Sequence, residues 1–92
     1  MALSRETILD RVRRVPPGYV TTYGDLSPGA PRHAGHVLSQ APKDVPRWRV
    51  VRSDGTLPKG QEQRARLLAE DVHMVGARVV MQEAHIPGEA IL

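Results

Sequence analysis

The sequence predicts a small, mainly α-helical domain that carries one β-hairpin, on the strength of three observations. Residues 1–40 contain short stretches with apolar residues at helical spacing, separated by proline and glycine. A later segment alternates apolar and charged residues and runs into a Ser-Asp-Gly turn, as a hairpin does. The 92 residues include no Phe, one Trp and two Tyr, so the core must be aliphatic. Short helices followed by a hairpin form the outline of a winged helix-turn-helix domain, here spanning residues 1–92.

The first helix is predicted over residues 4–14. Ser4 is an N-cap residue type, and Leu3 and Ile8 stand at the spacing of a hydrophobic staple. Residues 16–18, Pro-Pro-Gly, end the helix.

Two further helices are predicted before residue 42. Residues 19–21 form an extended connection, after which Thr22 caps a brief helix that runs through Leu26. Pro31 then opens a helix over residues 31–40. Its inward side chains are predicted to be Ala34, Val37 and Leu38, and its outward residues Arg32, Gly35, His36 and Ser39.

The second half of the chain is predicted to begin with the hairpin. Trp48 to Arg52 form its first strand, residues 53–55 its turn and residues 56–57 its second strand. A last helix is predicted over residues 61–71. Its buried face is predicted to include Ala65, Leu68 and Val72. Residues 77–81 are predicted to form a strand, and the tail after Pro87 is predicted to be loosely held.

Composition excludes several kinds of chemistry. The chain has no cysteine, which rules out disulfides, thiolate metal sites and a cysteine nucleophile. No apolar run approaches the ~20 residues that span a bilayer, and no secretion signal opens the sequence, so we expect a cytoplasmic protein. Residues 1–60 hold ten Lys/Arg against five Asp/Glu, whereas residues 61–92 hold three against five. This asymmetry favours a polyanionic partner, and the alternative is an ordinary solvated surface.

Four ordered segments between Ile8 and Val72 carry a more specific signal. Residues 15–26 read Val-Pro-Pro-Gly-Tyr-Val-Thr-Thr-Tyr-Gly-Asp-Leu, and residues 46–55 read Pro-Arg-Trp-Arg-Val-Val-Arg-Ser-Asp-Gly. They resemble the DNA-binding domain of the O6-alkylguanine-DNA alkyltransferases, whose patterns are Val-Pro-x-Gly-x-Val-x-Thr-Tyr-Gly-x-(Leu/Ile) and Pro-Cys-His-Arg-Val. Residues 31–37 resemble the recognition helix of that family, and residues 67–72 its Leu-x-x-Glu-Gly-Val segment.

The positions that carry catalysis in that family are changed. Arg47 matches the nucleophilic cysteine, and Trp48 matches the histidine that activates it. A guanidinium remains protonated and cannot attack an alkyl carbon, and an indole cannot act as the base. Alkyl transfer is therefore excluded, and the chain resembles the alkyltransferase-like proteins, which bind alkylated guanine in DNA without repairing it.

The resemblance also implies which residues contact DNA. Tyr23 matches the tyrosine that crowds the phosphate 3′ of the target nucleotide and helps to rotate the base out of the stack. Gly35 stands where the family carries an arginine that fills the gap left by the base. Either Arg32 or His36 takes that role, or this protein flips bases poorly or not at all. The predicted DNA-binding residues are Tyr23, Arg32, Ala34, Gly35, His36 and Ser39.

A lesion pocket is predicted beside this helix. Its predicted lining residues are Tyr23, Arg47, Trp48, Arg49, Val50 and Ser53. Arg49 matches an arginine that mostly supports the site in the family, and Trp48 either stacks on a base or packs in the core. Arg52, Ser53 and Lys59 are predicted to reach phosphates or simply to be solvated.

The resemblance therefore implies a monomeric protein without metal or cofactor. It would bind duplex DNA through the minor groove, sense O6-alkylguanine by base flipping, and hand the lesion to nucleotide excision repair proteins. Two alternatives stay open: a winged-helix DNA-binding protein without lesion specificity, and a degenerate domain used only for protein contacts.

Overall fold

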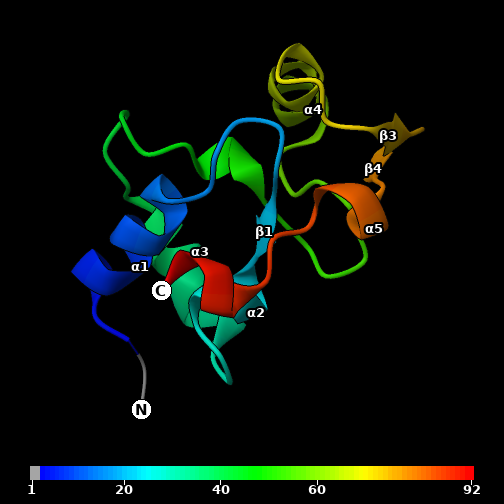
Figure 1. Ribbon diagram of the computed structural model, residues 1–92. Coiled ribbons are helices and arrows are strands. Elements are labelled where there is room, and N and C mark those ends of the chain that lie inside the picture. Colours follow the sequence, from blue (N-terminus) through cyan, green and yellow to red (C-terminus); the bar gives the residue numbers. More distant parts are fainter. Residues whose placement is uncertain (1–2) are drawn as a thin grey trace.

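The computed structural model describes residues 3–92, and its amino-terminal half consists of three helices and the short strand β1 (Thr21–Thr22) (Figure 1). Helix α1 (Arg5–Arg13) begins at Ser4, whose hydroxyl accepts a hydrogen bond from the backbone N–H of Thr7 at 3.2 Å. Leu3 packs against the core. The buried side chains of the helix are Ile8, Leu9 and Val12. The predicted first helix and its cap are therefore confirmed.

Helix α2 (Tyr23–Leu26) is one turn long and depends on a capping box. Thr22 Oγ1 accepts a hydrogen bond from the backbone N–H of Asp25 at 3.1 Å, and the Asp25 carboxylate accepts one from the backbone N–H of Thr22 at 3.3 Å. The same carboxylate lies 2.6 Å from His85 Nε2. Burial alone would raise the pKa of Asp25, but hydrogen bonds from His85 and Thr22 lower it. The predicted cap is confirmed, and it fixes Tyr23 as the first residue of the helix.

Helix α3 (Pro31–Ser39) starts with a proline, whose missing N–H would have no partner in a first turn. The side chains of its inner face, all buried, are Ala34, Val37 and Leu38. Arg32, His36 and Ser39 are exposed and Gly35 is partly buried, as the helical spacing predicts. One predicted DNA contact needs correction: Ala34 is fully buried, because it shares the inward face with the residues three and four positions later.

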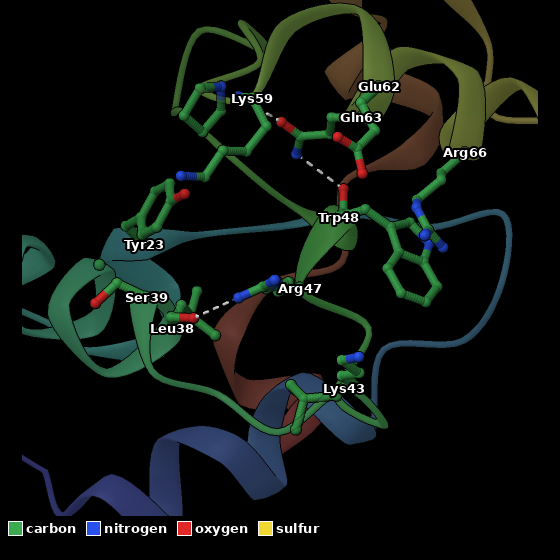
Figure 2. A pocket seen from close by; sticks show the side chains of 13 residues that line it. Tyr23, Leu38, Ser39, Lys43, Arg47, Trp48, Lys59, Glu62, Gln63 and Arg66 are labelled. Atoms are coloured by element: carbon green, nitrogen blue, oxygen red, sulfur yellow. Dashed lines mark hydrogen bonds between the residues drawn. The ribbon is translucent and has the colours of Figure 1, made fainter.

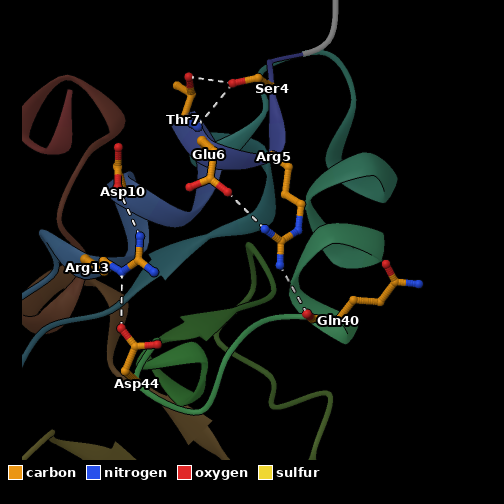
Figure 3. A network of polar contacts seen from close by, with 8 residues as sticks. All are labelled: Ser4, Arg5, Glu6, Thr7, Asp10, Arg13, Gln40 and Asp44. Carbon is orange, nitrogen blue, oxygen red and sulfur yellow. Dashed lines mark hydrogen bonds and ion pairs between the residues drawn. The ribbon is translucent and has the colours of Figure 1, made fainter.

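Polar contacts tie α1 to the chain that follows α3 (Figure 3). Arg13 lies 3.1 Å from Asp10 and 3.5 Å from Asp44, and Arg5 donates to the carbonyl of Gln40 at 3.4 Å. These side chains remain solvated, so each contact contributes little to stability.

The hairpin predicted over residues 48–57 does not form. Arg47–Arg49 make a short 3₁₀ helix (η1), and the strand that follows, β2 (Val50–Val51), pairs in parallel with β1 (Thr21–Thr22). Val50 and Val51 are both fully buried, as is typical of strands in a parallel pair, whereas a surface hairpin would leave one face exposed. The Ser-Asp-Gly turn is real, because Gly55 N–H donates to Arg52 O at 2.8 Å.

Helix α4 (Gly60–Ala69) confirms the last predicted helix but presents a different face. Its buried side chains are Gln63 and Leu67, whereas Leu68 is 42% exposed and Ala65 is exposed. The prediction failed because it treated glutamine as a solvent-facing residue. Gln63 is 2% exposed and has its hydrogen bonds supplied by main-chain groups, as described below.

At the end of α4, Asp71 stands where the segment that residues 67–72 resemble carries glycine. The N–H of Asp71 donates to Leu68 O at 3.0 Å, and the N–H of Val72 donates to Leu67 O at 3.0 Å, which is the Schellman arrangement. Asp71 has φ of 62°, in the left-handed region that the family fills with glycine. Val72 is buried, as predicted.

The hairpin of this fold lies further along the chain. Strands β3 (Met74–Val75) and β4 (Arg78–Val79) pair antiparallel, and β4 falls within the strand predicted over residues 77–81. The fold class, mainly α with one small hairpin, is confirmed with the hairpin displaced.

The carboxyl-terminal segment is held rather than loose. After α5 (Met81–Ala84), the N–H of Ile86 donates to Val20 O at 2.9 Å, and η2 (Gly88–Ile91) places the fully buried Ile91 in the core beside α1. Figure 1 shows this last segment, in red, lying against the amino-terminal helices. The predicted loose tail is therefore wrong, because an apolar residue four positions beyond Pro87 supplies core volume.

Two adjoining hydrophobic clusters make up the core. One gathers side chains mainly of α1, α2 and α3. The other consists of Val20 just before β1, Val51 of β2, Leu67 of α4, Val72, Val79 of β4 and Ala84 of α5. Among residues 3–92, no helix has the length and apolar character needed to cross a membrane.

Candidate nucleic-acid interface

A pocket of about 850 Å³ opens between two parts of the fold. One wall comes from α2 and α3 through Tyr23, Gly35 and Ser39, and the other comes from η1 and α4 through Trp48 and Gln63. Figure 2 shows these side chains around the opening, with Arg47 between the two walls. The pocket therefore lies where the predicted recognition helix meets the segment that would carry the nucleophile.

The structure brings half of the predicted pocket residues together. Tyr23, Arg47 and Trp48 line the pocket, and so do Gly35 and Ser39 from the predicted DNA-binding set. The other three predicted pocket residues lie outside it: Arg49, Val50 and Ser53. Val50 is fully buried in the core and Ser53 sits in an exposed turn, because the 3₁₀ helix η1 ends at Arg49 and leads into the buried strand β2. The predicted DNA-binding residues Arg32 and His36 are exposed on α3 beyond the lining.

Tyr23 and Gly35 lie next to each other in one wall of the pocket. A Cβ added to Gly35 would lie 3.9 Å from two carbons of the Tyr23 ring. Burial raises the pKa of the Tyr23 phenol, and the charge of Arg52 opposes this effect. The phenol is therefore neutral at physiological pH and can donate a hydrogen bond.

Arg47 points into the pocket from η1. Its Nη1 donates to the carbonyl of Leu38 at 3.3 Å, near the end of α3, and the side chain is exposed. This bond uses one of its five N–H donors. The remaining donors can reach a group placed in the pocket.

Trp48 is fixed in place by polar and cationic neighbours. Its indole N–H donates to Glu70 at 3.2 Å, and the Arg66 guanidinium lies 4.8 Å from the ring centroid. A cation at this distance from an aromatic face is attracted to it. Trp48 therefore forms a fixed part of the pocket wall.

Arg49 supports this wall from outside. It lies 2.6 Å from Glu70 through Nη2, and its Nη1 donates to the carbonyl of Val15 at 2.9 Å. The hydrogen bonds from Arg49 lower the pKa of Glu70, although burial acts in the opposite direction. This agrees with the supporting role that the resemblance gives to Arg49.

Gln63 joins the pocket wall to the core. Its amide nitrogen donates to the carbonyls of Trp48 and Val50 at 2.9 and 2.8 Å, and its oxygen accepts from the N–H of Lys59 at 3.1 Å. Every polar atom of this buried side chain has a partner, so it fixes α4 against η1 and β2.

Sequence reasoning placed none of the α4 residues in the pocket, and it gave Lys59 only a possible phosphate contact. The polar lining residues that it did not assign to the pocket are Lys43, Lys59, Glu62, Gln63 and Arg66. A signal was present, because residues 59, 62, 63 and 66 recur at helical spacing and share one face. Within residues 3–92, no group of three His, Cys, Asp or Glu side chains is placed to hold a metal ion.

Comparisons with known proteins all point to one family. The sequence of residues 4–72 matches the family model of the 6-O-methylguanine DNA methyltransferase DNA-binding domain. The DNA base-flipping protein of Escherichia coli strain K12 is 44% identical, over 72% of this chain and 60% of that protein. The chain thus spans 60% of the length of this curated relative.

Two solved structures share the fold. A crystal structure of S. pombe Atl1 in complex with damaged DNA containing O6-carboxymethylguanine has a TM-score of 0.80 and 26% identity, covering 89% of this chain and 93% of that one. A second structure, of S. pombe ATL in complex with DNA, has a TM-score of 0.73 at 24% identity, over 90% of this chain and 94% of that one. The chain therefore belongs to the 6-O-methylguanine DNA methyltransferase DNA-binding domain family, as an alkyltransferase-like member.

Proposed function

We propose that this protein recognises damaged DNA without repairing it. It binds duplex DNA and holds an O6-alkylguanine, rotated out of the helix, in the pocket between α3 and α4. The observation that carries this proposal is the pocket itself, which joins Tyr23 on one wall to Arg47 and Trp48 on the other. The base-flipping relative and the Atl1 complex with damaged DNA support the same function.

The chemistry of the pocket supports recognition rather than catalysis. No cysteine occurs in the chain, and the resemblance places Arg47 at the position of the family's nucleophile. A planar guanidinium and an indole suit contact with a purine, because both stack on a nucleobase face. The bound base would keep its alkyl group and would not be altered chemically in the pocket.

The remaining steps are part of the proposal. The exposed side of α3, with Arg32, His36 and Ser39, would lie in the minor groove, where exposed cationic and polar side chains meet phosphates and base edges. The lesion, held outside the stack, would then be passed to nucleotide excision repair proteins.

A direct titration tests lesion recognition. We expect a duplex with one O6-methylguanine to bind about tenfold more tightly than the unmodified duplex at constant salt. Fluorescence anisotropy with both duplexes at two salt concentrations measures this. Equal affinities for the two duplexes would contradict lesion recognition.

Tyr23→Ala is expected to reduce base flipping more than overall affinity. The phenol is half-buried beside Gly35 and stands where it can crowd a phosphate, whereas the cations of the interface remain. We expect the fluorescence of a 2-aminopurine at the target position to fall at least about threefold at saturating protein, with duplex affinity changed less. Tyr19→Ala is a matched control, because Tyr19 is 46% exposed and does not line the pocket. An undiminished signal in Tyr23→Ala would remove its proposed role.

One feature favours a second function, binding of DNA without flipping. Gly35 has no side chain at the position where the family carries the base-replacing arginine, so that role would have to fall to another residue of α3 such as Arg32 or His36. This function predicts no 2-aminopurine signal at saturating protein for the unaltered chain, together with ordinary salt-dependent duplex binding.

A further inference from the structure

The charges around the pocket are strongly unequal. Four cationic side chains line it, and Glu62 is the one carboxylate among the described lining residues. The cations come from the loop after α3, from η1 and from α4 with its preceding loop. They are Lys43, Arg47, Lys59 and Arg66. A concave site with this imbalance has a positive potential.

These cations are not neutralised by the protein. Among residues 3–92, no carboxylate lies within 4.0 Å of any of the four, although other arginines of the chain have such partners. Arg66 lies against the Trp48 ring, which leaves its charge in place. Arg47 has only the Leu38 carbonyl, a neutral acceptor. Cationic donors of this kind form their strongest hydrogen bonds with anionic acceptors.

We propose that the pocket prefers O6-alkylguanines whose alkyl group ends in a carboxylate over neutral adducts of the same size. Arg47 is the residue that sets this preference. This inference rests on the proposed function and names its substrate class. A guanidinium donates two parallel hydrogen bonds to a carboxylate, whereas a neutral adduct would cover the cation without pairing it.

Three duplexes of one sequence provide the test. One contains O6-carboxymethylguanine, one its neutral carboxamide of the same heavy-atom count, and one unmodified guanine. We expect the carboxymethyl duplex to bind about tenfold more tightly than the carboxamide duplex, since charge-assisted hydrogen bonds are the stronger class. Raising the salt should reduce this ratio, because the pocket is open to solvent.

Arg47→Gln is expected to reduce the ratio between the two adducts to less than about threefold. Arg13→Gln is the control, because it removes the same charge from an exposed residue of α1 outside the pocket, and it should keep the ratio (Figure 3). Arg47 is exposed, so its variant should fold. If thermal melting shows otherwise, Lys59→Gln replaces it and should also lower the ratio.

The outcomes separate the two proposals. Equal binding of both adducts, each tighter than guanine, would overturn the charge preference and leave lesion recognition standing. No preference for either adduct over guanine would overturn both. If Arg47→Gln weakened all three duplexes by the same factor, Arg47 would contact the DNA backbone and the inference would be wrong.

Discussion

Replacing Glu70 with alanine is expected to lower the free energy of unfolding by about 3 kcal/mol, because it leaves a largely buried guanidinium without its carboxylate. Arg49 and Glu70 are 12% and 16% exposed, and they lie 2.6 Å apart. Because both side chains keep some contact with water, the expected loss of unfolding free energy is at the lower end of the range measured for buried ion pairs. The indole N–H of Trp48 loses its acceptor as well, so the pocket wall should loosen. Urea unfolding measures the loss, and weaker lesion binding should accompany it.

The same carboxyl gives a pH dependence with a defined sign. Hydrogen bonds from Arg49 lower the pKa of Glu70 below its ordinary value of 4.5 in the folded protein. A carboxyl with a lowered folded pKa stabilises the fold above its unfolded pKa, and this stabilisation is lost as the pH falls through the folded value. The drop in stability between about pH 7 and about pH 3 should therefore be smaller in Glu70→Ala than in the unaltered protein.

Glu83→Ala is the matched control for this prediction. Glu83 pairs with His73, but both side chains are 57% exposed, so we expect a loss below about 1 kcal/mol. If Glu70→Ala lost no more stability than Glu83→Ala, the Arg49–Glu70 pair would not hold the pocket wall.

Gly35→Arg is expected to increase affinity for an O6-methylguanine duplex about tenfold and to raise the 2-aminopurine signal. Gly35 is helical and lines the pocket, and a Cβ there would make only ordinary van der Waals contact with Tyr23 at 3.9 Å. The resemblance places the base-replacing arginine of the family at this position. The variant would therefore supply the side chain that fills the gap left by the flipped guanine.

Gly35→Ala separates the effect of a base-replacing side chain at position 35 from the effect of a more stable helix. Alanine and arginine should each stabilise α3 by about 1 kcal/mol relative to glycine, since glycine is a poor helix former. Only arginine can fill the gap in the base stack. Equal gains in affinity for the two variants would show that helix stability, and not the lack of a base-replacing side chain, limits binding.

Local signals in the sequence predicted the elements that depend on near neighbours. Ser4 caps α1, Thr22 and Asp25 form the box of α2, and Pro31 opens α3, each through contacts within four residues. The inward face of α3 followed from helical spacing in the same way. Tyr23 and Arg47 were also placed at the pocket from motif positions alone.

Predictions failed where a residue depends on a distant partner. Val50 and Val51 read as one arm of a hairpin, yet they pair in parallel with Thr21 and Thr22. Gln63 reads as a surface residue, yet main-chain carbonyls of residues 48 and 50 make its burial favourable. Ile91 reads as part of a loose tail, yet it fills the core beside α1.

The sequence by itself determined the caps of α1 and α2, the inward face of α3, the family and the absence of a cysteine nucleophile, because caps, periodicity and a missing thiol are properties of adjacent or single residues. Only the tertiary structure decided which side chains form the pocket. Arg49 lies outside the pocket and pairs with Glu70. Lys43, Lys59 and Arg66, which come from separate segments of the chain, line it. Contacts between distant segments arise from how the elements pack, and packing joins residues whose spacing along the chain gives no sign that they will meet.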